Sequence, residues 1–407
     1  MPGGGRAGSN LIAVIVAALG YFVDVYDIWL YSILRKPSLI ELGLDEAGVK
    51  SVGEALLNWQ MAGFILGAII FGVVADRKGR LTVLFASILL YSIANVANGF
   101  VQDVTQYAVC RFVAGVGLAG ELGAGIALVS ELMTAKNRGW ATTFVATVGV
   151  AGSVAAPLIA TQTHWRTSYV IGGSMGLVLL LLRIGVFESG MFEAVKERTD
   201  VRRGDLRQLF SDKARIKRYL ATIMCGAPVW FFAGLMMTFS PELQKGLGLA
   251  EPIEAPKIVM IAAIGLCVGD VIFGAISQFL RSRKKAFFLA YLWMAAILVV
   301  IFTMTKTTTA FYWLMFLGGV GAGFWAVFVT TAGEVFGTNL RGTVATTAPS
   351  FVRGLVIPMT LGRRALEPAL GTIGATAALA VIVLVLAAWS VALLPETYGR
   401  DMDFVET

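Results

Sequence analysis

Hydrophobic residues run along this chain in long blocks, and short polar segments separate the blocks. Each block holds about 20 residues, which as a helix would rise about 30 Å and cross the hydrocarbon core of a bilayer. The pattern therefore predicts an all-α polytopic membrane protein. Twelve transmembrane helices are expected, at residues 11–34, 52–75, 81–101, 104–130, 139–160, 168–187, 218–240, 257–280, 286–305, 309–332, 342–362 and 369–394.

The polar segment between the sixth and seventh blocks is the longest and is rich in Lys, Arg, Asp and Glu. We expect this segment, residues 188–217, to be a cytoplasmic linker. It would join an N-terminal six-helix bundle, residues 1–187, to a C-terminal six-helix bundle, residues 218–407. A basic segment of this kind is attracted to anionic lipid.

Composition favours a membrane protein over a soluble one. Hydrophobic residues make up 57% of the 407 residues and charged residues only 14%, whereas soluble chains carry about 25% charged residues. The net charge of +7 does not predict nucleic-acid binding, because the basic residues lie in the short segments between apolar blocks. One His and three scattered Cys have no metal-binding spacing, and no nucleotide-binding loop is present. No cofactor, metal site or catalytic site is expected, and the chain is not expected to be an enzyme.

The distribution of basic residues predicts the orientation in the membrane, because cytoplasmic loops carry an excess of Lys and Arg. Most of them lie before the first block or after the even-numbered blocks. Fewer lie on the opposite side, where we place Arg35 and Arg363 in outer loops and Glu54 close to the outer water. Both termini are therefore expected in the cytoplasm. The first block is too long for a signal peptide, and a bacterial inner membrane is the expected location.

The two halves resemble each other at an offset near 203 residues. The pattern Glu-x6-Arg-Gly occurs in both halves, beginning at Glu131 and at Glu334, and Gly115 and Gly120 align with glycines of the second half. Two six-helix repeats are a known plan for transporters, with a substrate site at the midplane between the repeats. Glycine runs in the fourth and tenth blocks predict close helix approach.

Four motifs near helix boundaries carry a family resemblance: Gly72-x3-Asp76-Arg77-Lys78-Gly79-Arg80, Arg111-x3-Gly115, Gly149-x7-Pro157 and Pro395-Glu396-Thr397-x-Gly399-Arg400. In this order they resemble the signatures of the major facilitator superfamily, and in particular its organic-acid/proton symporters and organic-ion carriers. The resemblance implies a secondary transporter that works by rocker-switch alternating access. It also implies that charge pairs at the cytoplasmic face gate the cycle, with bridges Glu131–Arg138 and Glu334–Arg341. The gating candidates are Asp76, Arg77, Arg80, Glu131, Arg138, Glu334 and Arg341.

Charged residues that lie deep in a helix of one half, without a charged counterpart in the other half, are the candidates for proton coupling and substrate binding. Such charges cost roughly 2.5–3.5 kcal/mol in a membrane helix and usually face a cavity. Seven residues meet this description: Asp24, Asp27, Arg111, Glu121, Arg183, Asp270 and Arg353. Of these, Arg183 lies near the inner end of its block, where its side chain can extend to the membrane interface, and a structural role is expected for it.

Proton coupling is expected at the acids of this set. Asp24 and Asp27 lie one turn apart on the same face of the first helix, and Arg111 lies at a similar depth in the fourth. Burial favours the neutral acid and a nearby Arg favours the charged one, so such a cluster can load and release a proton. The alternative is a permanent ion pair. Glu121 and Asp270 are further proton-coupling candidates, or ion-pair partners for Arg353 or Arg183.

Arg353, near the middle of the eleventh helix, offers a planar charged fork that suits a carboxylate or phosphate. The resemblance to organic-anion carriers implies substrate contact there, and the alternative is a bridge to Asp270. The substrate-binding candidates are Arg353, Arg111, Gln60, Asn58, Tyr31, Trp230 and Trp325. The string Asp-x-x-Asp at Asp24 resembles that of organic-acid symporters, but Val25 stands where the aromatic-acid members have Gly, which argues against an aromatic substrate.

Three functions fit these observations. The first is a monomeric proton-coupled symporter of a small organic anion such as a carboxylate metabolite, with that anion, protons and the lipid bilayer as its partners and no nucleic acid. The second is a proton-coupled exporter (antiporter) or organic-cation carrier in which Asp24 or Asp27 attracts the cation; the central Arg353 argues against it. The third is a sensor on the same scaffold that does not transport, and the lack of an appended domain argues against it.

Overall fold

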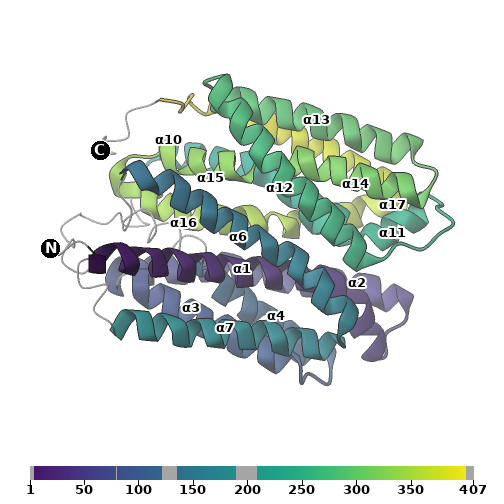
Figure 1. Cartoon of the computed structure of the whole chain (residues 1–407). Coiled ribbons are helices and arrows are strands. Elements are labelled where there is room, and N and C mark those ends of the chain that lie inside the picture. Colours follow the sequence, from purple (N-terminus) through teal and green to yellow (C-terminus); the bar gives the residue numbers. More distant parts are fainter. Residues whose placement is uncertain (1–3, 79, 122–134, 189–208, 400–407) are drawn as a thin grey trace. The chain divides into compact units, whose positions relative to one another are not determined.

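The computed structural model describes residues 4–78, 80–121, 135–188 and 209–399, and every regular element in these ranges is a helix (Figure 1). The all-α fold expected from the hydrophobic pattern is therefore confirmed. The chain divides into two compact units, Met1–Asp205 (unit 1) and Leu206–Thr407 (unit 2). The division falls within the polar segment 188–217.

Unit 1 pairs its helices lengthwise. Its described helices are α1 (Gly4–Glu41), α2 (Glu46–Lys78), α3 (Arg80–Asn98), α4 (Val104–Leu118), α6 (Ala135–Gln162) and α7 (Trp165–Glu188). Helix α1 packs along α6 and also contacts α7, α2 packs along α4, and α3 lies against both α4 and α7. The residues around the buried ion pairs discussed below lie on α1, α3, α4 and α7 or, for Glu121, just after α4.

Unit 2 repeats this packing. Its described elements are α10 (Lys213–Trp230), the π-helix η1 (Phe231–Met237), α11 (Ser240–Gly246), α12 (Ala255–Phe279), α13 (Arg283–Met304), α14 (Thr308–Ala322), α15 (Trp325–Glu334), α16 (Thr338–Gly354) and α17 (Val356–Leu393). Helix α12 packs along α14, α13 against α14 and α17, and α10 against α16 and α17. These are the counterparts of the unit 1 pairs at the repeat offset, so the repeat extends from sequence to packing.

Eight described stretches are long and apolar enough to cross a membrane. They are Val14–Glu41, Glu46–Val74, Trp165–Ile184, Lys213–Met237, Ala255–Phe279, Arg283–Met304, Thr308–Glu334 and Thr343–Leu393; Thr82–Asn98 and Val104–Leu118 are shorter apolar helices. The last stretch, of 51 residues, contains both the eleventh and the twelfth predicted helices. Each of the twelve predicted blocks thus lies wholly or partly on a helix, as an integral membrane protein requires.

One predicted boundary is wrong. Residues 363–368 were expected to form an outer loop, but α17 runs through them, and its backbone first leaves the helical conformation at Gly371, where φ is 66°. A positive φ of this size favours glycine. Arg363 therefore lies on a helix and is buried. The helix continues past this charge because Glu367, one turn later, lies 3.7 Å from the Arg363 guanidinium.

Glycine permits the close contact between α2 and α4. A Cβ atom added at Gly63 would collide with the carbonyl oxygen of Phe112, and one added at Gly115 with that of Gln60. Small residues at such crossings let two backbones approach. The α12–α14 crossing repeats the contact at Gly319, against the backbone of α12. The close helix approach predicted from the glycine runs is confirmed at both crossings.

Candidate functional site

The ion pair predicted for proton coupling is present inside unit 1. Nη2 of Arg111, on α4, lies 3.7 Å from Oδ1 of Asp27, on α1, and neither side chain is exposed. Arg111 also donates a hydrogen bond to Oδ1 of Asn95, on α3. Its Cζ lies 4.6 Å from the ring centroid of Tyr169, on α7. Four helices therefore meet at one buried charge pair, and Asn95 and Tyr169 are partners that the sequence did not single out.

Buried hydroxyl groups hold Tyr169 in place. Its hydroxyl lies 2.9 Å from that of Tyr107, on α4, which lies 3.2 Å from Oγ of Ser38 near the end of α1. All three side chains are fully buried. The ring beneath Arg111 is thus fixed by hydrogen bonds as well as by packing. The only sequence signal for this network was the presence of polar residues within apolar blocks.

The predicted substrate-binding residues of α1 and α2 differ in their surroundings. Gln60 is buried, and neither its amide nitrogen nor its amide oxygen has a hydrogen-bond partner among the described residues. Buried polar groups normally have a partner, so this amide suits a ligand. Tyr31 donates its hydroxyl to the carbonyl of Gly53 at 2.7 Å, within unit 1. Asn58 is half-buried.

A second ion pair in unit 1 joins Glu121 to Arg183. Nη1 of Arg183 lies 3.1 Å from Oε2 of Glu121, and Nη2 donates to Oε1. Ser87, on α3, donates to Oε2 at 3.4 Å. The side chain of Arg183 does not extend to a surface of unit 1, because it is only 7% exposed and faces the carboxylate. The expected role of Glu121 as an ion-pair partner of Arg183 is confirmed.

Two charges expected at the outer end of unit 1 are buried instead. Arg35 is 1% exposed and Glu54 is 6% exposed. Nη1 of Arg35 donates to the carbonyl of Val49 at 3.4 Å, and its side chain lies against Gly53 of α2. The reason is that α1 continues to Glu41, so its last turns pack against the start of α2 and leave no outer loop at Arg35.

Arg353 and Trp230, both predicted to bind substrate, lie together in unit 2. Arg353, on α16, is 3% exposed. Its Cζ lies 5.6 Å from the ring centroid of Trp230, the last residue of α10. The face of an indole ring attracts a cation. The π-helix η1 follows Trp230 directly, and π-helical turns are frequent at functional sites.

Two further predicted site residues, Asp270 and Trp325, lie around the break between α14 and α15. Oδ1 of Asp270, on α12, accepts a hydrogen bond of 2.9 Å from the backbone N–H of Ala326. A carboxylate at a helix N-terminus is stabilising, so Asp270 fixes the start of α15. Trp325 stacks on Phe328 with ring centroids 4.8 Å apart.

Arg363 is a buried charge that the sequence interpretation misplaced. Its side chain is 2% exposed, and besides Glu367 it contacts Phe239, whose ring centroid lies 5.3 Å from its Cζ. The signal that could have identified it is the spacing of four residues between Arg363 and Glu367, which places opposite charges on one helix face.

Among the gating candidates, Glu334 makes the most described contacts. Arg283 of α13 binds it through two hydrogen bonds, Nη2 to Oε1 at 2.9 Å and Nε to Oε2 at 3.2 Å. Thr397 donates its hydroxyl to the same carboxylate at 2.7 Å. Arg341 donates from Nε to the carbonyl of Gly333 at 3.0 Å. Arg283 was not among the gating residues predicted from the sequence.

Glu396, in the motif after α17, binds the start of α13. Its carboxylate accepts from the Ser282 hydroxyl and from the backbone N–H groups of Arg283 and Tyr398, at 2.9 and 3.1 Å. Burial by itself would raise the pKa of Glu396, but these hydrogen bonds stabilise the charged form and bring the pKa below its ordinary value. This motif residue therefore connects the chain after α17 to α13.

The remaining gating candidates cannot be assigned contacts. Glu131 lies outside the described residues, and the side chains of Asp76, Arg77, Arg80 and Arg138 do so too, although α2, α3 and α6 include their backbones. In the part of the chain that is described, no three His, Cys, Asp or Glu side chains are grouped to hold a metal ion. The three cysteines are free.

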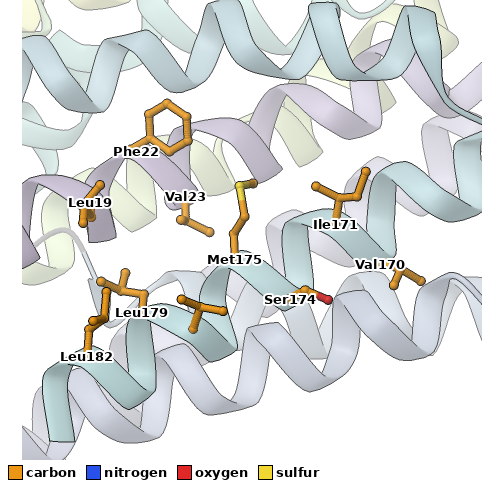
Figure 2. Close-up of a pocket in the computed structure, with 10 residues that line it drawn as sticks. Leu19, Phe22, Val23, Val170, Ile171, Ser174, Met175, Leu179 and Leu182 are labelled. Carbon is orange, nitrogen blue, oxygen red and sulfur yellow. The ribbon is translucent and has the colours of Figure 1, made fainter. Parts of the chain in front are cut away.

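An apolar cavity of about 430 Å³ lies between α1 and α7 (Figure 2). It is lined by Leu19, Phe22, Val23, Val170, Ile171, Ser174, Met175, Val178, Leu179 and Leu182. Ser174 is the single polar residue of this lining, and none of the predicted site residues belongs to it. A cavity without charge or strong donors does not select an anion, so the candidate site is the set of buried charges.

Known proteins resemble this chain along nearly its whole length. A Haemophilus influenzae protein named as a metabolite transport protein is 27% identical over 410 residues, which cover 96% of this chain and 97% of that protein. The gentisate transporter of Corynebacterium glutamicum is 26% identical over 407 residues, covering 93% and 88%. Among solved structures, a D-xylose-proton symporter has a TM-score of 0.70 at 17% identity and covers 96% of this chain and 99% of its own. At that identity the likeness shows the fold.

The sequence model of the Major Facilitator Superfamily matches residues 17–360. The matched region begins in α1 and ends in α17, so it covers most of both units and includes the buried charges Asp27, Arg111, Glu121, Arg183 and Arg353. Its extent agrees with the paired helices of the repeat and with the apolar stretches that can cross a membrane. The chain belongs to the Major Facilitator Superfamily, whose members are membrane transporters and not enzymes.

Proposed function

We propose that this protein is a proton-coupled symporter of a small organic anion and works by alternating access. The observation that carries the proposal is the fully buried pair of Asp27 and Arg111, 3.7 Å apart. A buried carboxylate is stable while the guanidinium compensates its charge. When Asp27 takes up a proton, Arg111 loses its counter-ion and attracts an anion from the substrate. Proton binding and anion binding thereby favour each other.

Unit 2 contributes a second attraction for an anion. The Arg353 guanidinium lies over the Trp230 ring. A carboxylate fits the planar fork of an arginine through two parallel hydrogen bonds. Within unit 1, the Gln60 amide is a further proposed substrate contact, because it is a buried donor and acceptor. Asp24, Glu121 and Asp270 are the further acids proposed for proton coupling.

The names of the relatives support the proposed substrate class. Gentisate is a carboxylate, and the Haemophilus influenzae relative is named for metabolite transport. The solved D-xylose-proton symporter supports coupling to protons in this fold. Because one relative is named for an aromatic acid, both aliphatic and aromatic carboxylates belong among the substrates to be tested, although Val25 argues for the aliphatic ones.

The distribution of basic residues supports an orientation in the membrane. We infer that both termini lie in the cytoplasm, because the Lys and Arg residues outside the apolar blocks concentrate in one set of segments. We also propose that the protein is a monomer and lies in a bacterial inner membrane. The segment 188–217 then joins the two six-helix bundles at the cytoplasmic face. We also propose gating through charge pairs at that face, for which the contact of Glu334 with Arg283 is the described example.

Proton movement in proteoliposomes tests the proposed function. The purified protein would be reconstituted with an internal pH dye and given external carboxylates, phosphates and organic cations in turn. We expect internal acidification when a carboxylate is added, and at least a tenfold lower rate in Asp27→Asn. Asp103→Asn is the matched control: this exposed residue caps α4, Asn caps as well as Asp, and the rate should not change.

Two other outcomes would overturn the proposal. Carboxylate uptake without any proton movement would contradict coupling. Internal alkalinisation on addition of an organic cation would indicate an antiporter, in which the acids of α1 attract the cation and Arg353 has a structural role.

A further inference from the structure

Unit 1 contains two buried ion pairs that are built largely on the same helices. The groups around the first pair are Asp27, Asn95, Arg111 and Tyr169, and those around the second are Gly20, Ser87, Glu121 and Arg183. The first set takes one residue each from α1, α3, α4 and α7, and the second takes one each from α1, α3 and α7 together with Glu121, which follows the end of α4 by three residues. Along α1, the seven residues from Asp27 to Gly20 correspond to a rise of about 10 Å. The two pairs are therefore successive levels of one polar interior.

Tyr91 lies between these two levels. It is on α3, one turn from Ser87 and one turn from Asn95, and it is fully buried. Its hydroxyl reaches toward Gly176 of α7, where an added Cβ would lie 3.1 Å from the phenolic oxygen. Gly176 is seven residues from both Arg183 and Tyr169, so the hydroxyl lies about midway between the levels.

The Tyr91 hydroxyl has no hydrogen-bond partner among the described residues. Buried hydroxyls are nearly always hydrogen-bonded, so a group left in this state is available for a transient partner. The charged groups that act on it are Glu121, just after the end of α4, Arg183 of α7, and Asp24 and Asp27 of α1. The hydroxyl thus lies within electrostatic range of acids at both levels.

The second half shows that the scaffold does not require these polar groups. At the repeat offset of 203, Ser87, Tyr91 and Asn95 correspond to Ala290, Met294 and Leu298 of α13. Those three residues are buried on the corresponding face of α13. Helix α13 packs against α14 and α17 as α3 packs against α4 and α7. The same packing is therefore achieved with apolar residues at these three positions, and the polar residues of α3 there require a functional explanation.

We propose that the proton crosses the interior of unit 1, from the Asp27–Arg111 pair to the Glu121–Arg183 pair, and that the Tyr91 hydroxyl is the intermediate proton carrier. This inference rests on the proposed proton symport. The proton leaves Asp27 for the carboxylate of Asp24, one turn away on α1. In the central step, the protonated carboxyl of Asp24 gives its proton to the phenolic oxygen while the phenolic proton passes to the carboxylate of Glu121. The phenol is neutral before and after this step. Rotation of its hydroxyl then returns the O–H bond to its starting direction. The proton route is thereby separate from the Arg353 site.

Two rates measured in proteoliposomes test this route. Tyr91→Phe removes only the hydroxyl. We expect it to lower substrate-induced proton influx at least tenfold, while exchange of labelled anion across the membrane stays within about twofold, because exchange needs no net proton transfer. Tyr91→Met introduces the residue of the repeat counterpart and should give the same result. Tyr219→Phe is the matched control: it removes a buried hydroxyl of unit 2 that lies 2.6 Å from Thr347 Oγ1, and both rates should stay within about twofold.

The outcomes separate this inference from the proposed function. Wild-type proton influx in Tyr91→Phe would overturn the route. Equal loss of influx and exchange in both Tyr91 variants would also overturn it, since the residue would then be structural. If the wild-type protein itself moves no protons with any substrate, the proposed symport fails, independently of Tyr91.

Discussion

Arg183, on α7, and Glu121, three residues after the end of α4, form a two-pronged ion pair inside unit 1, with Nη1 and Nη2 of the guanidinium directed at the two carboxylate oxygens. The side chains are 7% and 2% exposed. Each charge is therefore tolerated only because the other compensates it. Helix α1 approaches the pair at Gly20, where a Cβ atom would collide with both side chains, so the pair also sets the packing of α1.

Removing one member of this pair is expected to destabilise the protein strongly. Arg183→Ala leaves the Glu121 carboxylate buried without its counter-charge, which costs about 3–5 kcal/mol. The double variant Glu121→Gln/Arg183→Gln should be less destabilised than the single one. Thermal unfolding in detergent measures both. His164→Ala, which breaks an exposed contact with Glu41, is the control and should cost at most about 1 kcal/mol. A single variant as stable as this control would contradict charge compensation.

Replacing Arg353 by Lys is expected to weaken substrate binding although the charge is kept. Lys has no planar fork for a carboxylate and loses the stacking on Trp230. We expect KM for the anion to rise about tenfold, which corresponds to about 1.4 kcal/mol, and Arg353→Ala to abolish uptake. Uptake of labelled substrate by proteoliposomes measures both. Arg364→Lys, at an exposed position of α17, should leave KM within about twofold, and an unchanged KM in Arg353→Lys would exclude bidentate binding.

A methyl group at Gly115 is expected to push α4 away from α2. The added Cβ would collide with the Gln60 carbonyl, and overpacking of this kind costs about 1–3 kcal/mol. Gly115→Ala should therefore lower the unfolding temperature in detergent. In Gly274→Ala the added Cβ has open space around it, and the better helix propensity of Ala should stabilise by up to about 1 kcal/mol. A higher unfolding temperature in both variants would show that the α2–α4 contact tolerates the methyl group.

Glu396 is expected to make stability depend on acid pH. Its pKa in the folded protein lies below the ordinary value because hydrogen bonds from Ser282 and from backbone N–H groups outweigh burial. The carboxylate therefore contributes stability above the unfolded pKa of about 4.3, and the contribution is lost as the pH falls through the folded pKa. The unfolding temperature should fall on acidification from pH 7 to pH 3, and Glu396→Gln should show a smaller fall. Equal falls in the two proteins would rule out this contribution.

The helical organisation of this protein was determined by its sequence. A segment in lipid must satisfy its own backbone hydrogen bonds, so an apolar block of sufficient length has one regular structure available, and the blocks can be counted along the chain. The same one-dimensional reasoning gave the depth of Asp27 and Arg111, because rise per residue is constant in a helix. Their pairing at 3.7 Å agrees with that depth.

The tertiary structure alone decided which buried charges meet. Depth along a helix says nothing about the rotation of one helix against another, so packing decided which of its candidate partners Glu121 meets, Arg183, and that Glu334 meets Arg283. The same holds for Arg363. The sequence interpretation placed it in an outer loop, whereas the structure places it on α17 in contact with Glu367 and Phe239. Hydrophobicity is a property of each residue, whereas the compensation of a buried charge is a property of its neighbours.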